Sequence, residues 1–249
     1  MSGLQIIGIK HIPLIESGED LFQIILDAFS KNSITLVSGD IIVITSKVVS
    51  KAEGRVIRLN DFTPSASEKS LANQLNKDPK LLSAILSETK KIIKIKNGIM
   101  ICETSHGFIC ANAGVDQSNV PKGFVSLLPV NPDNSAEEIR FKFLDKLNVN
   151  VAVIITDTFG RPWRNGFVNV AIGVSGLDPI LSYKGQIDPY GYNLRVTDLA
   201  ISDELASAAE LVMGKVDNIP VALIRNYLFQ PDHGGAHKLV RDASTDIFR

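Results

Sequence analysis

Residues 151–166, VAVIITDTFGRPWRNG, constrain the fold more than any other stretch of the chain. Five consecutive apolar residues, 151–155, predict a strand that is buried on both faces. Asp157 and Thr158 follow almost at once, and the nearby glycine and proline are expected to stop any regular element. A carboxylate and a hydroxyl at the end of a buried strand suit a hard cation with several oxygen ligands. The same residues also suit a simple turn cap, so both interpretations stay open.

Arg161 and Arg164 complete the same stretch. Planar guanidinium groups bind phosphate or carboxylate well, because their donors match both oxygens of such an anion. We therefore interpret both arginines as candidates for contact with acidic substrates. The alternative is that they are solvated surface residues.

The composition is that of an ordinary globular protein and excludes several classes of function. The chain has 249 residues, 45% apolar and 21% charged, enough for a sizeable core. A formal net charge of −1 gives no electrostatic footprint for nucleic acid or an anionic membrane. Apolar runs are far shorter than the ~20 residues of a membrane helix, and the N-terminus lacks signal-peptide features. We expect a cytoplasmic protein with no nucleic-acid or membrane partner.

The cysteines and the clustered histidines do not predict a zinc site. Cys102 and Cys110 have no histidine at zinc-binding spacing and lie in apolar, strand-like segments. We expect both to be buried free thiols in a reducing compartment. His233 and His237 are four residues apart, but the Gly-Gly between them opposes the helix that would bring both to one metal ion.

A second buried strand is predicted at residues 41–44, and it leads directly into the polar segment 45–55, TSKVVSKAEGR. If that segment stays extended, Lys47 and Lys51 share a face about 13 Å apart. On a helix they would be neighbours. In either conformation, two ammonium groups and two hydroxyls suit polyphosphate oxygens. The alternative is a solvated sheet edge protected by lysines.

A third strand, predicted within residues 108–113, is followed by another polar cluster with a single carboxylate. Asp116 is a candidate second metal ligand, and the amide of Asn119 is a candidate for reading a base or a sugar. The alternative is an Asx-type turn, which these residue types favour without any ligand.

Periodicity and turn residues predict the other elements. We expect helices over 20–29, 65–90, 135–147 and 203–213, and further strands over 4–9, 92–95, 98–102, 168–174 and 220–225. Ser135 and Glu138 predict a capping box at the start of the third helix. The sequence contains no P-loop, no dinucleotide-binding fingerprint and no nucleophile elbow.

The polar clusters form an ordered set of motifs. IPLI at 12–15 comes first, followed by TSKVVSKAEGR, NAGVDQSN, ITDTFGRPWRNG and finally LVMGK before Ile219-Pro220. Each motif alone is weak, but the ordered set resembles the coenzyme F420-0:γ-glutamyl ligase family. The resemblance runs from Ile12 to the Asp-Ile-Phe-Arg end. It implies an α+β, CofE-like fold of mixed β-sheets with flanking helices, in an intertwined homodimer. It also implies a single ligase module over 1–249, of one or two sub-domains, without a C-terminal flavin domain.

The resemblance also implies a function. It indicates a GTP-dependent ligase of coenzyme F420 biosynthesis that joins L-glutamate to F420-0 and then adds a γ-linked glutamate, through an acyl phosphate. The residues implied to line the GTP site are Ile12, Pro13, Leu14, Ile15, Ser46, Lys47, Lys51 and Asn119. A loop implied to close over the nucleotide consists of Leu211, Val212, Met213, Gly214, Lys215, Val216, Asp217 and Asn218.

The family pattern further implies metal-assisted chemistry. Asp116, Asp157 and Thr158 would hold two divalent ions, magnesium or manganese, and potassium commonly assists. Asp116, Asp157 and Lys51 would neutralise charge on the moving phosphoryl group. Two positions depart from the family pattern, which often has threonine at Lys47 and is sometimes acidic near Lys215.

Two other classes of function remain as alternatives. One is a metal-dependent phosphohydrolase or kinase that acts on another phosphorylated substrate with the same carboxylates. The other is a non-catalytic nucleotide-binding protein.

Overall fold

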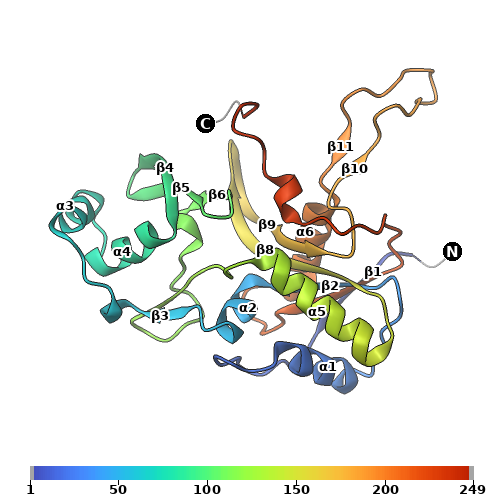
Figure 1. The fold of residues 1–249 in the computed structure, drawn as a ribbon, viewed down its shortest axis with the longest axis horizontal. Helices are drawn as coiled ribbons and strands as arrows, with labels where there is room; N and C mark the ends of the chain where they lie inside the picture. Colours follow the sequence, from blue (N-terminus) through green and yellow to red (C-terminus); the bar gives the residue numbers. More distant parts are fainter. Residues whose placement is uncertain (1–2, 247–249) are drawn as a thin grey trace.

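The larger part of the protein is built on one five-stranded sheet (Figure 1). The computed structural model describes residues 3–246, so the last three residues of the family resemblance lie outside the described residues. In spatial order the strands of this sheet are β1 (Gln5–Ile9), β12 (Val221–Arg225), β2 (Ile41–Thr45), β8 (Ala152–Arg161) and β9 (Arg164–Ser175).

The pairing directions bring several chain segments to one edge of this sheet. β2 and β8 pair in parallel, whereas β12 is antiparallel to both β1 and β2. β1, β2 and β8 therefore point the same way, and β12 points the opposite way. The register puts Ile9, Val221, Ile44 and Ile155 in one row across the sheet. The residues after β1, after β2 and before β12 consequently meet beside the second half of β8.

Both faces of the central strands are buried, as their unbroken apolar sequences predict. Ile42 and Ile44 belong to the core that includes α1 (Leu21–Lys31) and α5 (Pro132–Leu147). Ile41 and Val43 belong to the opposite core, with α6 (Ile201–Met213). Residues 151–155 are likewise fully buried, which confirms the prediction for β8.

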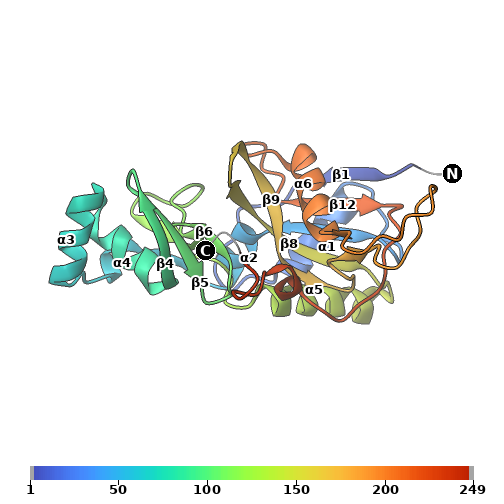
Figure 2. The ribbon, with the colours of Figure 1, turned by 90° about the horizontal axis from the view of Figure 1, so that it is seen from above.

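A second, smaller lobe has its own hydrophobic core and lies at one end of the molecule (Figure 2). Its core includes Leu82, Met100 and Val125. The lobe consists of α3 (Ala66–Leu75), α4 (Pro79–Ser87), β3 (Val56–Arg58), β7 (Phe124–Ser126), β4 (Thr89–Lys96), β5 (Ile99–Thr104) and β6 (Ile109–Ala111). Short 3-10 turns lie at Leu59–Asp61, Asn112–Gly114 and, outside this lobe, Ala236–Leu239.

A narrow arm extends from the large sheet. It begins at β10 (Leu181–Ser182), returns at β11 (Asp198–Leu199) and projects away from the body between them (Figure 1). Ile187, Tyr190 and Val196 are 71%, 97% and 84% exposed, so the arm presents apolar and aromatic surface to solvent.

The main differences from the sequence prediction concern two of the predicted helices. The helical stretch 65–90 is two helices, because Asn76 adopts a left-handed conformation (φ 51°) and Pro79 starts a new helix. The third helix starts at Pro132, so the predicted capping box at Ser135 is wrong. Asn131 is the N-cap instead, and its side chain accepts from the Asn134 N–H.

The cysteine prediction is confirmed. Cys102 and Cys110 face each other across β5 and β6, and both are buried free thiols. Within residues 3–246, no helix is both long and apolar enough to cross a bilayer.

Candidate active site at the edge of the large sheet

Asp157 is held beside the end of β2 by strand register. β2 and β8 pair in parallel with Thr45 opposite Thr156, so the next residues, Ser46 and Asp157, are neighbours. Ser46 is buried at the start of α2 (Ser46–Ala52) and its Oγ donates to Asp157 Oδ1 at 2.8 Å. The sequence predicts that the strand ends before this carboxylate and that Gly160 and Pro162 stop any regular element. The first expectation is wrong, and β8 also continues through Gly160, but it does end at Arg161, directly before Pro162. β8 continues to Arg161 because it pairs with β9 as a hairpin.

The environment of Asp157 makes its charge costly. Burial raises the pKa of this carboxyl to about 6, although hydrogen bonds from Ser46 and the Thr158 backbone oppose the shift. The nearby Lys47 charge also lowers its pKa, and the Asp116 charge raises it. Among the described residues, no lysine or arginine donates a hydrogen bond to Asp157. A partly buried carboxylate without such a partner is a site where a cation is favoured.

Asp116 comes from the small lobe and is paired with a lysine. Lys47 Nζ donates to Asp116 Oδ2 at 2.6 Å and to the backbone oxygen and Oγ of Ser118 at 3.0 and 2.7 Å. The Ser118 N–H also donates to Asp116 Oδ1 at 2.8 Å. Burial alone would raise the pKa of Asp116, but the hydrogen bonds from Lys47 and Ser118 outweigh it and leave that pKa lowered.

Lys47 therefore connects two carboxylates that lie far apart in the sequence. It hydrogen-bonds Asp116 from the small lobe, and its charge acts on Asp157 from the large sheet. Cys110, on β6 of the small lobe, is also within electrostatic reach of Asp157. The Asp157 charge contributes, after burial, to raising the pKa of the Cys110 thiol to about 12. The two predicted metal-binding carboxylates are thus within electrostatic reach of each other, although their roles stay predictions.

The helical alternative for the two lysines is the one that the structure adopts. Lys47 and Lys51 lie one turn apart on α2. Burial, followed by the charge of Lys47, lowers the pKa of Lys51. No carboxylate in the described part of the chain forms a salt bridge with Lys51. Its ammonium group is consequently available for an anionic ligand.

Thr158 points into a second group of polar side chains. Its Oγ1 donates to Asn169 Oδ1 at 2.7 Å, and the two residues are register partners in β8 and β9. Lys215 Nζ donates to Thr158 Oγ1 at 2.6 Å and to Asn169 Oδ1 at 3.2 Å, and it forms a salt bridge with Glu210. The Asn169 backbone N–H donates to Glu210 Oε2 at 3.0 Å, which ties α6 to β9.

The segments predicted to line the nucleotide site reach the same edge of the sheet. Residues 12–15 follow β1, with Ile12 and Ile15 buried and Leu14 82% exposed. The predicted closing loop precedes β12, but its first three residues belong to the last turn of α6, so only Gly214–Asn218 is a loop. Asn119 is exposed beyond Ser118 in the small lobe, with a left-handed backbone (φ 55°).

The two arginines lie at the far end of the β8–β9 hairpin. Arg161 Nη2 donates to the Asn165 backbone oxygen at 2.9 Å, and its buried Nε has no hydrogen-bond partner among the described residues. Arg164 is exposed. Four residues of strand, about 13 Å, separate Arg161 from Asp157. The arginines are therefore near the site but not inside the carboxylate group, and their substrate role stays a prediction.

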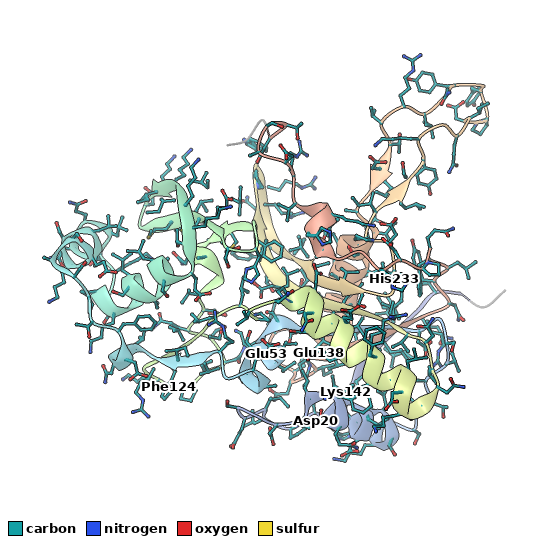
Figure 3. The ribbon with its side chains drawn as sticks, in the orientation of Figure 1. Asp20, Glu53, Phe124, Glu138, Lys142 and His233 are labelled. Carbon is teal, nitrogen blue, oxygen red and sulfur yellow. The ribbon has the colours of Figure 1, made fainter. Side chains whose placement is uncertain are left out.

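Other hollows and clusters do not compete with this site. A hollow of about 330 Å³ lies between α1, α2 and α5, where Asp20, Glu53, Glu138 and Lys142 gather (Figure 3). A second hollow of about 450 Å³ lies around Arg55 and His106. None of the predicted site residues lines either one. Across residues 3–246, no group of three or more His, Cys, Asp or Glu side chains is arranged to hold a metal ion.

Comparisons with known proteins match a stretch of the chain that contains all of these segments. The family model described as F420-0:Gamma-glutamyl ligase matches residues 8–226. The chain belongs to this family. A relative from Methanothermobacter thermautotrophicus, named Coenzyme F420:L-glutamate ligase, is 44% identical over 250 residues and 99% of each chain. Proteins of the same name from Methanopyrus kandleri and Methanocaldococcus jannaschii are 42% and 44% identical. The alignment with the Methanopyrus protein covers 100% of both chains. The alignment with the Methanocaldococcus protein covers 99% of this chain and 97% of the relative.

Three residues of this candidate site are missing from the sequence prediction. Ser118 lies inside a predicted motif and escapes notice because serine is common in turns. Asn169 interrupts the apolar run of β9, and this single polar residue is the signal that the sequence offers. In the structure its side chain is 3% exposed and hydrogen-bonded, as buried polar groups usually are. Glu210 precedes the LVMGK motif on α6, and only the fold shows that it faces β9.

Proposed function

We propose that this chain is a GTP-dependent ligase that joins L-glutamate to F420-0 in coenzyme F420 biosynthesis and then adds a γ-linked glutamate. Membership of the F420-0:Gamma-glutamyl ligase family over most of the chain gives the reaction class. The observation that carries the proposal is the meeting of Asp157, Asp116 and their lysine neighbours at one sheet edge. Phosphoryl transfer depends on such positioned charge.

The reaction proceeds in two balanced steps. A carboxylate oxygen of F420-0 attacks the γ-phosphorus of GTP, the bond to the bridging oxygen breaks, and GDP leaves with that electron pair. The product is an acyl phosphate. The free amine of glutamate then attacks the acyl carbon, a C–N bond forms and the C–O bond to phosphate breaks. The amine loses one proton to solvent, and an amide and inorganic phosphate remain.

The lysines of α2 are suited to the phosphate groups. Lys51 has no salt-bridge partner among the described residues, so it can bind phosphate oxygens without breaking an internal pair. Lys47 keeps Asp116 in place and adds positive charge beside it. Ser46 fixes the orientation of Asp157. Residues 12–15, Asn119 and Gly214–Asn218 complete the GTP site in this proposal.

A divalent ion, magnesium or manganese, fits beside Asp157. The fit rests on a partly buried carboxylate that lacks a hydrogen-bonded lysine or arginine within the described chain. Two nearby carboxylates are few protein ligands, but magnesium usually completes its shell with waters and substrate phosphates. When bound, the ion would neutralise charge on the triphosphate. Potassium is a further expected cofactor.

Arg161 and Arg164 are proposed to contact the acidic substrates. F420-0 and glutamate are anionic, and the guanidinium group of Arg161 places positive charge about 13 Å along β8 from Asp157. In Arg164→Ala, the KM for glutamate or F420-0 should rise about tenfold. An unchanged KM for both substrates would remove Arg164 from the proposal.

We also propose that the chain forms a homodimer through its arm. The arm exposes Ile187, Tyr190 and Val196, and a projecting segment with such surface favours contact with a second copy. Light scattering should give twice the chain mass for the native protein and the chain mass after replacement of 186–193 by a short glycine linker. A monomeric native protein would contradict this part of the proposal.

Mass spectrometry of F420-0 incubated with glutamate, GTP and manganese tests the reaction. The expected result is the addition of one or more glutamyl units, with one GDP and one phosphate formed per unit. Phosphate release without glutamate would instead indicate a phosphohydrolase. Nucleotide binding without turnover would indicate a non-catalytic nucleotide-binding protein.

A further inference from the structure

The ammonium group of Lys215 is surrounded by oxygens in the way that a bound cation would be. Thr158 Oγ1 and Asn169 Oδ1 lie 2.6 and 3.2 Å from Nζ, and the Glu210 carboxylate forms a salt bridge with it. A hydroxyl, an amide oxygen and a carboxylate are also typical ligands of hard cations. One of the three, Thr158, is a residue for which the sequence predicts a divalent ion.

The local fold holds Lys215 in this position. Lys215 follows Gly214, which ends α6 with a positive φ of 61° and turns the chain back toward β8 and β9. Glu210 is on the last turn of α6, and its Oε2 accepts from the Asn169 backbone N–H. The ammonium group thus completes a polar group that joins α6, β8 and β9.

Asp157 and the neighbouring Thr158 differ in whether a lysine already contacts them, and this difference bears on how many metal ions the site can bind. No lysine or arginine of the described chain donates to Asp157, whereas the oxygens at Thr158 are already occupied by Lys215. A divalent ion at Thr158 would have to lie beside the Lys215 ammonium, whose side chain is 56% exposed but pairs with Glu210, and like charges at such distances repel strongly. The predicted second metal ion does not fit the residues present.

We propose that the Lys215 ammonium replaces the second divalent ion, so that removal of Lys215 opens a cation site formed by Thr158, Asn169 and Glu210. This inference rests on the proposed function, because it concerns the cations at the same phosphate site. Lys215 is a positioning residue here: it supplies a permanent charge, where a metal ion would supply one only when bound.

Counting manganese ions on the free protein tests this inference without substrates. Titration of the chain with Mn²⁺, followed by electron paramagnetic resonance of the unbound ion, gives the number bound per chain. Lys215→Ala should bind about one ion more than the native protein, since small oxygen-rich sites take one ion each. Lys215→Arg retains the charge and should bind the native number.

The controls separate a new site from a loss of surface charge. Lys142→Ala removes a lysine that pairs with Asp20 far from this group, and it should leave the ion count unchanged. Adding Glu210→Gln to Lys215→Ala should abolish the extra ion. Lys215→Ser, which also removes the charge, replaces Lys215→Ala if that variant does not fold. Equal ion counts for the native chain and the charge-removing variant would overturn the inference. The ligase proposal fails separately, by the absence of glutamylated product.

Discussion

The two carboxylates of the site differ in how their charge is stabilised. Asp116, in the small lobe, is half exposed and hydrogen-bonds Lys47 and Ser118, which lower its pKa. Asp157, in the large sheet, is partly buried without a hydrogen-bonded lysine or arginine in the described chain, and desolvation raises its pKa to about 6. The protein therefore neutralises one carboxylate with its own lysine, and within the described chain it gives the other no such partner. This difference separates the structural contribution of Asp116 from the ion-binding role we propose for Asp157.

The largest effect is expected from Asp157→Asn. Removing the carboxylate that would hold the ion should lower kcat about 1,000-fold, because metal-assisted charge neutralisation is a large part of phosphoryl transfer. Steady-state kinetics of GDP formation measure this effect. Asp27→Asn, on the outer surface of α1, is a matched control and should retain native activity. Activity within tenfold of native for Asp157→Asn would remove the contrast between the two carboxylates.

A smaller loss is expected from Asp116→Asn. Because Lys47 already neutralises Asp116, the substitution should cost about 10-fold to 100-fold in kcat/KM for GTP. Combining it with Lys47→Met should cost less than the sum of the two single changes, since both remove the same ion pair. A double-variant cycle in the same assay measures this coupling. Fully additive losses would show that the Lys47–Asp116 pair does not act as a unit.

The pH dependence of stability sharpens the comparison. Asp157 has a raised pKa in the folded state, so its contribution to stability is present below pH 3.8 and is lost as pH rises through about 6. In the presence of a chelator, Asp157→Asn should be about 1–2 kcal/mol more stable than the native chain at pH 8. Near pH 4 the difference should vanish. Urea unfolding at both pH values measures it, and a constant difference would contradict the raised pKa.

The smallest effect concerns Asp116 alone. Lys47→Met removes its main hydrogen-bond donor, and burial should then raise the pKa of this carboxyl above its native value. Carbon NMR titration of the aspartate carboxyls gives the shift, and Lys142→Met serves as the matched lysine control. An unchanged pKa in Lys47→Met would assign the stabilisation of Asp116 to Ser118.

The sequence predicts the central strands and most of the candidate site, because both depend on local patterns. Residues 41–44 and 151–155 are apolar without interruption, which is typical of strands buried on both faces. Polar residues directly after them identify Ser46, Lys47 and Asp157. The course of β8 beyond Asp157 is not predictable in this way, because pairing with β9 outweighs the local preference of Gly160 to break the strand.

The contacts of Lys215 are equally invisible in the sequence. They depend on α6 ending beside β9, and no local pattern records where a helix docks. The lysine pair of Asp116 also joins residues 69 positions apart. Sequence patterns therefore predict which residues are available for chemistry, whereas the tertiary structure determines which of them are already neutralised.

The most direct test of the central claim is a crystal structure with a non-hydrolysable GTP analogue and manganese, recorded at the manganese absorption edge. The account predicts an anomalous peak within about 2.3 Å of the Asp157 carboxylate, with a phosphate oxygen as another ligand. It also predicts that Lys51 contacts the triphosphate. A nucleotide bound at another surface, or a peak that avoids Asp157, would contradict it.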